Sequence, residues 1–292
     1  MLQFVQQRYP HLWPWLQLTR LDRPIGTLLL LWPTLWAVWI AGDGSPSLRT
    51  ILVFTLGVIV MRAAGCVIND FADRNVDGHV RRTEGRPLAT GALTGKQALM
   101  LFAGLIAVAL VLVLFLNPFA FWLSFGGLGL AVLYPFTKRF THLPQLFLGA
   151  AFSWAIPMAF AAEINALPPA VWLLYTANLL WTVAYDTQYA MVDREDDLKI
   201  GVRSTAILFG DADRAIIALL QGMALFPLML LGRQLAFGWI WWLAMGTAAS
   251  LFAYQFWLTR DRDGASCFRA FLNNQWVGAA LFVGVLLEYV LR

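Results

Sequence analysis

Long apolar runs separated by short polar segments dominate the chain from residue 24 to residue 290. A helix of roughly 20 apolar residues crosses the hydrocarbon core of a bilayer, and about nine runs here have that length. We therefore expect an all-α polytopic membrane protein with about nine transmembrane helices in a bundle. The expected spans lie near residues 24–41, 49–69, 97–116, 119–136, 144–162, 169–192, 213–232, 237–258 and 271–290.

The composition agrees with this pattern. Hydrophobic residues make up 60% of the chain and charged residues only 13%, which excludes an ordinary soluble domain. We expect one integral-membrane domain over residues 1–292. Cys66 and Cys267 lie in or beside separate runs without metal-ligand spacing, so small packing residues are the better interpretation.

Basic residues indicate the orientation. Most of the 21 Lys and Arg residues precede the first run or follow the second, fourth, sixth and eighth runs. By the positive-inside rule, the N-terminal segment 1–23 and the loops 78–94 and 197–210 face the cytoplasm, with a bacterial inner membrane as the expected location. The net charge of +4 is then a topogenic signal, and we expect no nucleic-acid partner.

Two acidic clusters, at 69–77 and 186–197, close the second and sixth runs. Their recurrence after four runs suggests two related four-helix halves with the ninth helix appended. On a helix at about 100° per residue, each cluster places its members on one face, within roughly 80–100° of arc. Glu195 points to the opposite face and Asp196 lies at the margin. The one-faced sets are Asn69, Asp70, Asp73 and Asp77, and Asp186, Tyr189, Asp193 and Asp197.

Carboxylates at a membrane edge are costly unless they are compensated, and a hard divalent cation such as Mg²⁺ is the natural compensator. Mg²⁺ commonly accompanies a phosphorylated substrate, whose charge nearby cations would help to neutralise. The alternative is that the clusters are solvated helix ends and that the cations serve only as orientation signals. The candidate cations are Arg74, Arg81, Arg82, Arg86, Lys138 and Arg139.

Four long blocks carry a resemblance to a known family. They are "LDRPIGTLLLLWPTLWA" at 21–37, "MRAAGCVINDFADRNVDGHVRRTEGRPLATG" at 61–91, "YPFTKRFTHLPQLFLGAAFSWAIPMAFAA" at 134–162 and "AYDTQYAMVDREDDLKIGVRSTAILFG" at 184–210. With these blocks the chain resembles the UbiA superfamily of intramembrane aromatic prenyltransferases over nearly its whole length. The second acidic motif looks like the branch that acts on 4-hydroxybenzoate in ubiquinone biosynthesis.

The resemblance implies a helical bundle around a central cavity that opens sideways to lipid. It also implies Mg²⁺-dependent transfer of a polyprenyl group from its diphosphate to the ring carbon ortho to the hydroxyl of 4-hydroxybenzoate. The metal would be held by Asn69, Asp73, Asp77, Asp193 and Asp197. The diphosphate would be bound by Asp70, Arg74, Arg81, Arg82, Arg86, Tyr134 and Lys138.

Two further roles follow from the same resemblance. Asp186 and Tyr189 are expected to polarise the phenol or to accept the ring proton. Arg139 is the first candidate for the carboxylate of the aromatic acid, with Arg23 and Arg62 as alternatives. Two other functions stay open: a transporter, which would place charges near the membrane midplane, and a branch of the superfamily that accepts a different ring.

Overall fold

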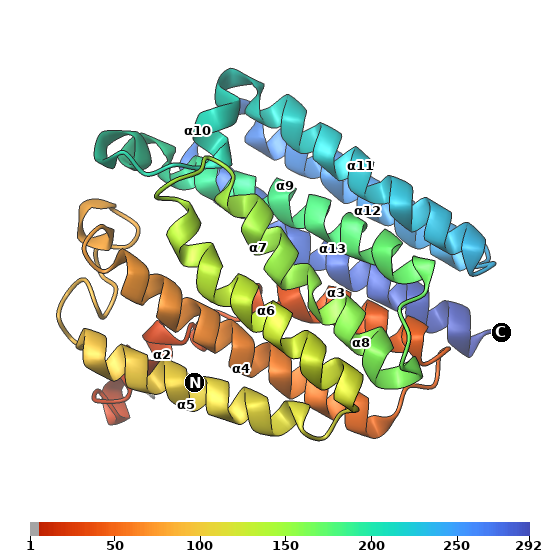
Figure 1. The fold of residues 1–292 in the computed structure, drawn as a ribbon. Helices are drawn as coiled ribbons and strands as arrows, with labels where there is room; N and C mark the ends of the chain where they lie inside the picture. Colours follow the sequence, from red (N-terminus) through yellow and green to blue (C-terminus); the bar gives the residue numbers. More distant parts are fainter. Residues whose placement is uncertain (1–5) are drawn as a thin grey trace.

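Helices form the whole of the regular structure in the computed structural model, which describes residues 6–292. The first five residues of the expected N-terminal segment 1–23 lie outside this range. The long helices run side by side along a common direction (Figure 1). In chain order they are α2 (Trp13–Leu18), α3 (Ile25–Ala41), α4 (Leu48–Asp73), η1 (Asp77–His79), α5 (Gly95–Val113), α6 (Pro118–Thr137), α7 (Pro144–Ser153), α8 (Ala155–Ile164), α9 (Pro169–Ile200), α10 (Thr205–Phe209), η2 (Gly210–Ala212), α11 (Asp213–Gln234), α12 (Trp239–Leu258), η3 (Thr259–Asp261) and α13 (Gly264–Val290).

Eight of the expected spans each lie in one helix, and the fifth is divided between α7 and α8. The division has a local cause. Pro157 has no backbone N–H and so cannot donate to the carbonyl of Ser153, the residue four positions earlier. Helix α7 ends at Ser153, and α8 begins at Ala155.

The all-helical membrane fold is confirmed. Within residues 6–292, six helical stretches are long and apolar enough to cross a membrane. The shorter apolar helix α3 packs against α4, α8 and α13. Helices α9 and α12 do not belong to these six, but α9 packs against α11 and α12 against α13. The six stretches are Leu48–Asp73, Gly95–Val113, Pro118–Thr137, Pro144–Ile164, Thr205–Gln234 and Gly264–Val290.

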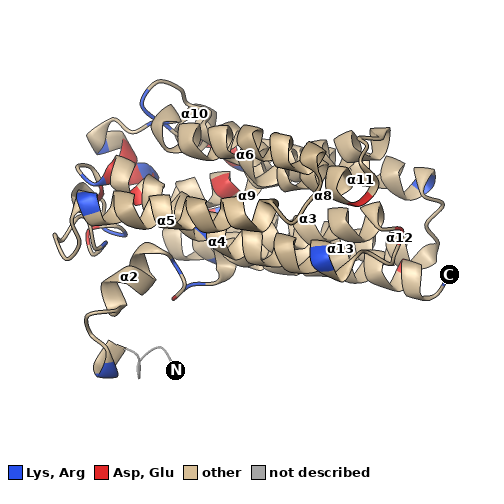
Figure 2. Ribbon diagram, turned by 60° about the horizontal axis from the view of Figure 1, so that its bottom comes forward, with Lys and Arg blue, Asp and Glu red and all other residues tan. Residues whose placement is uncertain are grey.

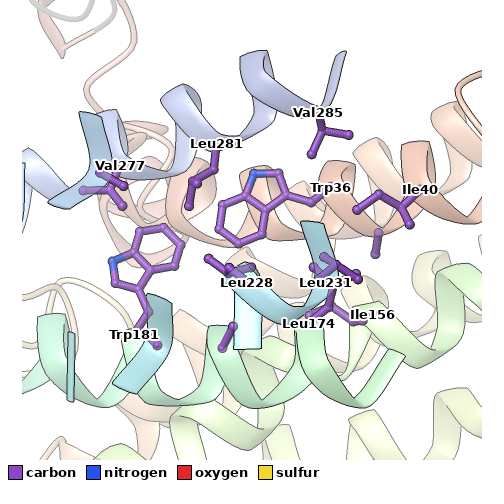
Figure 3. Close-up of a cluster of buried hydrophobic side chains, with 14 of the residues drawn as sticks. Trp36, Ile40, Ile156, Leu174, Trp181, Leu228, Leu231, Val277, Leu281 and Val285 are labelled. Atoms are coloured by element: carbon purple, nitrogen blue, oxygen red, sulfur yellow. The ribbon is translucent and has the colours of Figure 1, made fainter. Parts of the chain in front are cut away.

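A buried aromatic pair fixes α9 in the bundle. Trp36 of α3 stacks on Trp181 of α9, with ring centroids 5.6 Å apart, inside the apolar cluster of Figure 3. Both indole N–H groups are satisfied: Trp36 donates to the carbonyl of Gly278 at 3.0 Å, and Trp181 donates to Oδ1 of Asn274 at 2.8 Å. Both acceptors lie on α13, so three helices are joined just before α9 reaches its acidic cluster.

The helices that carry the acidic clusters end together. Helix α4 ends at Asp73, and α9 continues to Ile200, where Gly201 adopts a left-handed φ of 73°. Acidic and basic residues gather at this end of the bundle (Figure 2). The segment 197–210 therefore starts within the last turn of α9 and also contains α10.

Candidate active site

A polar cavity of about 150 Å³ lies where α4, α6 and α9 approach the connecting segments. Helix α4 and the turn after it supply the first acidic cluster, and α9 supplies the second. Residues far apart in the sequence thus meet in one cavity wall, as the one-faced spacing requires. The lining includes Asn69, Asp73, Asp77, Arg82, Arg86, Tyr134, Lys138, Asp186, Tyr189, Asp193 and Asp197.

Three of these carboxylates are paired with cations. The Lys138 ammonium contacts Asp73. Arg86 Nη1 donates to both oxygens of Asp77 at 3.0 and 2.9 Å.

The third pair joins the two acidic segments. Arg82 Nε donates to Oδ1 of Asp193 at 2.8 Å, and the Arg82 guanidinium lies over the ring of Tyr189, 4.5 Å from its centroid. Among the described residues, no three Asp, Glu, His or Cys side chains form a ready-made metal site.

The donor set nevertheless fits Mg²⁺. Five carboxylates and the amides of Asn69 and Gln145 line the same small cavity, and Mg²⁺ prefers such hard oxygen ligands. Asp197 has no ion pair with any residue from 6 to 292. An added divalent cation would neutralise charge that the three paired cations leave uncompensated.

The pKa values of two acids in the polar cavity also favour a bound cation. Burial, with the charge of Asp193 added, raises the pKa of Asp197 to about 7. Burial also raises the pKa of Asp77, against the opposing charge of Arg86. Both acids are thus held in surroundings that disfavour a bare carboxylate, which a bound cation would relieve.

Asp70 differs from its neighbours in the cluster. Its side chain is only 1% exposed and is held by two arginines. Arg20 Nη2 donates to both Asp70 oxygens at 2.9 and 2.8 Å, and Arg86 Nη1 lies 3.0 Å from Oδ1. Such an enclosed carboxylate can orient Arg86 but does not line the polar cavity. Sequence reasoning did not identify Arg20 as a site residue.

A second, larger cavity of about 1020 Å³ adjoins the polar one. Its walls are mostly apolar side chains of α3, α4, α5, α6 and α8, including Leu29, Val58, Leu110, Phe125 and Met158. Residues shared by both linings mark where the cavities meet. The shared residues are Asn69, Arg82, Arg86, Tyr134, Asp186 and Tyr189.

The three candidates for the acceptor carboxylate lie in different surroundings. Arg62 lines the large cavity, and its Nε is buried without a hydrogen-bond partner in the described chain. Arg23 also lines this cavity, but its side chain is 70% exposed and pairs with Asp22 at 3.4 Å. Arg139 is exposed, donates to the carbonyl of Ala72 at 2.8 Å and lines neither cavity.

Two other predicted cations lie outside both cavities. Arg74 is exposed and stacks on Phe71, with Cζ 4.3 Å from the ring centroid. Arg81 is exposed and pairs with Glu195 at 3.3 Å and with Asp196 at 3.1 Å. Neither acid lines the polar cavity, whereas Asp193 and Asp197 do.

The polar cavity also has lining residues to which the sequence analysis assigned no role. Gln145, Arg203 and Ser204 belong to its wall. Gln145 Oε1 accepts from the backbone N–H of Thr205 at 3.1 Å, which attaches the segment after α9 to α7. Isolated polar residues of this kind carry no spacing signal, so only the packing places them.

Comparison with known proteins gives consistent similarities. The model of the UbiA prenyltransferase family matches residues 30–282. A protein of Alcanivorax borkumensis named 4-hydroxybenzoate octaprenyltransferase is 68% identical over 99% of this chain and 100% of its own length. A protein of the same name from Pseudomonas syringae pv. syringae is 60% identical over 100% of this chain and 99% of its own.

Solved structures share the fold. A UbiA homologue from Aeropyrum pernix K1 superposes with a TM-score of 0.79 at 23% identity, over 89% of this chain and 97% of that one. A UbiA homologue from Archaeoglobus fulgidus bound to GPP and Mg²⁺ superposes with a TM-score of 0.74 at 18% identity, over 96% and 100%.

Proposed function

Because the chain belongs to the UbiA prenyltransferase family, we propose that it transfers an all-trans polyprenyl group from polyprenyl diphosphate to 4-hydroxybenzoate. The new bond forms at the ring carbon ortho to the hydroxyl. The products are 3-polyprenyl-4-hydroxybenzoate and diphosphate, a step of ubiquinone biosynthesis. The main structural support for this proposal is that a small charged cavity and a large apolar cavity meet and share six lining residues. This arrangement suits a substrate with a charged head and a long hydrocarbon tail.

We further propose that residues 1–292 form one domain of the bacterial cytoplasmic membrane. The N-terminal segment 1–23 and the segments 78–94 and 197–210 would face the cytoplasm. The gathering of basic residues at the end that carries the acidic clusters supports this orientation (Figure 2). Bacterial relatives support the choice of membrane.

Mg²⁺ would be held by Asn69, Asp73, Asp77, Asp193 and Asp197 in the polar cavity. Bound there, it supplies positive charge that stabilises the diphosphate as a leaving group. Arg82, Arg86 and Lys138 line the same cavity and bind the remaining phosphate oxygens, with Tyr134 beside them. Asp70, enclosed by Arg20 and Arg86, keeps Arg86 in place. Arg74 and Arg81, which lie outside the cavity, contribute positive potential at its mouth.

The chemistry takes place at the junction of the cavities. The bond between the allylic carbon and the diphosphate oxygen breaks, and its electron pair leaves with the diphosphate. The ring carbon of the acceptor then bonds to the allylic cation, and the displaced ring proton passes to the Asp186 carboxylate. The Tyr189 hydroxyl orients the phenol. Apolar walls around the large cavity exclude water, which would otherwise capture the cation.

We assign the acceptor carboxylate to Arg62, in preference to Arg23 and Arg139. Arg62 is the one of the three with a buried guanidinium nitrogen that no other described residue satisfies. A buried, unpaired donor is costly, and a carboxylate ligand would satisfy it with a charge-assisted bond. Arg62 lines the same cavity as Asp186 and Tyr189.

A diphosphate-release assay on the purified protein in lipid nanodiscs tests the proposal. We expect release only when Mg²⁺, polyprenyl diphosphate and 4-hydroxybenzoate are all present. Benzoate, which lacks the activating hydroxyl, is the matched acceptor control and should give none. Release that is independent of the aromatic acid would contradict the transfer reaction.

A further inference from the structure

Gly26 and Arg62 are in close contact. Gly26 is buried in the first turn of α3 and faces the guanidinium that α4 projects into the large cavity. A Cβ placed on Gly26 would lie 2.6 Å from Arg62 Cζ and even closer to Nε and Nη2. Real Cβ atoms do not come so near, so any other residue at position 26 must displace the guanidinium.

Among the glycines of the cavity wall in the described chain, Gly26 alone faces a charged side chain at this range; a Cβ on Gly127 would instead lie 2.8 Å from Cδ1 of Trp154. Gly57 and Gly65 on α4 line the same cavity, and a Cβ at either would meet nothing within 4 Å. Glycine is unfavourable within a helix compared with alanine. A buried helical glycine pressed against a functional arginine therefore needs a reason other than helix formation.

We propose that Gly26 is a positioning residue for the aromatic acceptor. Its missing side chain leaves a slot in α3 that holds the Arg62 guanidinium, and the slot sets the orientation from which Arg62 meets the acceptor carboxylate. The inference rests on the proposed function, in which Arg62 binds that carboxylate. It adds a residue that sets the orientation of Arg62. The orientation matters because a planar guanidinium binds a carboxylate through two parallel N–H···O bonds, which form only when the two groups are aligned.

The slot also gives a role to the start of the sequence block at 21–37. Pro24 is the N-cap of α3, with a φ of −72°, and its ring restricts the backbone just before the first turn. Gly26 follows two residues later and forms the wall against which Arg62 rests.

Substitution at Gly26 should disturb the site more than the fold. The atoms that a new Cβ would meet belong to the far end of a long flexible side chain, which can swing away. We expect Gly26→Ala to fold and to keep the KM for polyprenyl diphosphate. Its KM for 4-hydroxybenzoate should rise at least about tenfold, since misplacing a binding group by about 1 Å can cost up to ~100-fold.

The experiment is a double-mutant cycle measured on purified protein, with KM determined for each substrate. Gly104→Ala, at an exposed position of α5 where a Cβ meets nothing, is the matched control and should behave as the parent. Arg62→Lys should raise the acceptor KM by itself. Adding Gly26→Ala to Arg62→Lys should change it by less than about twofold, because residues acting through one contact are not additive.

The outcomes separate the inference from the proposed function. A parent-like acceptor KM in Gly26→Ala, with a raised one in Arg62→Lys, would overturn the positioning role and leave the Arg62 assignment standing. Full additivity of the two substitutions would also overturn it. A parent-like acceptor KM in Arg62→Lys and in Arg62→Ala would instead refute the assignment of Arg62.

Discussion

Arg20 holds Asp70 through both carboxylate oxygens, at 2.9 and 2.8 Å, across 50 residues of sequence. Arg20 precedes the first long helix and has a left-handed φ of 57°, whereas Asp70 lies within the last turn of α4. The pair attaches the N-terminal segment to the acidic cluster. It also encloses Asp70, which explains why this residue of the motif does not line the polar cavity.

Arg20→Ala should lower the free energy of unfolding by about 1–3 kcal/mol, because the buried Asp70 carboxylate would lose one of its two arginine partners. Thermal unfolding in detergent measures the change. Arg8→Ala removes an exposed arginine from the same segment and is the control. Equal midpoints for the two variants would show that the Arg20–Asp70 pair contributes nothing to stability.

Asp193→Ala should abolish turnover, whereas Glu195→Ala should stay within about threefold of the parent. Asp193 lines the polar cavity, but Glu195 is exposed and, within residues 6–292, pairs only with Arg81. Members of one metal-binding unit each cost nearly the whole activity when removed. We expect the same loss for Asp73→Ala, Asp77→Ala and Asp197→Ala.

Steady-state rates on folded, purified variants provide the measurement. Similar losses at Asp193 and Glu195 would contradict the assignment of one face of α9 to the metal.

Mg²⁺ binding should weaken as the pH falls from 8 to 6. Burial and the charge of Asp193 raise the pKa of Asp197 to about 7, so the carboxyl is partly protonated near neutrality. Mg²⁺ must displace that proton to bind, and a larger fraction of Asp197 is protonated at lower pH. Calorimetric Mg²⁺ titrations at both pH values test this, with Asp197→Asn as the control that should weaken binding and flatten its pH dependence. Identical affinities at pH 6 and 8 for the parent would contradict it.

The segments 78–94 and 197–210 should become more protected when donor and Mg²⁺ bind. Both adjoin the polar cavity, and the first supplies Arg82 and Arg86 to its wall. Charge-assisted bonds to phosphate would order them. Hydrogen exchange with a non-hydrolysable donor analogue, compared with free protein, reports the change. The prediction fails if neither segment gains protection while the cavity helices do.

The sequence predicts those site residues that share one helix, but not those that only tertiary packing brings together. Helical periodicity brings Asp193 and Asp197 to one face and leaves Glu195 on the other, because these positions share one rigid helix. That the ends of α4 and α9 line one cavity follows from motif chemistry. The choice between Arg62 and Arg139 does not, since Arg62 lies within α4 and Arg139 follows α6, and only packing decides which one lines a cavity. The Gly26 slot and the Arg20–Asp70 pair likewise join residues with no common spacing.

The identity of the product tests the central claim most directly. Purified protein supplied with Mg²⁺, polyprenyl diphosphate and 4-hydroxybenzoate should yield one aromatic product. By mass spectrometry its mass should equal the acid plus the prenyl group minus one hydrogen, and by NMR the prenyl group should be on the carbon ortho to the hydroxyl. Asp186→Asn should lower its yield at least about a hundredfold, as expected for loss of a catalytic base. A prenyl ether on the phenol oxygen, or only the hydrolysed prenyl alcohol, would contradict the account.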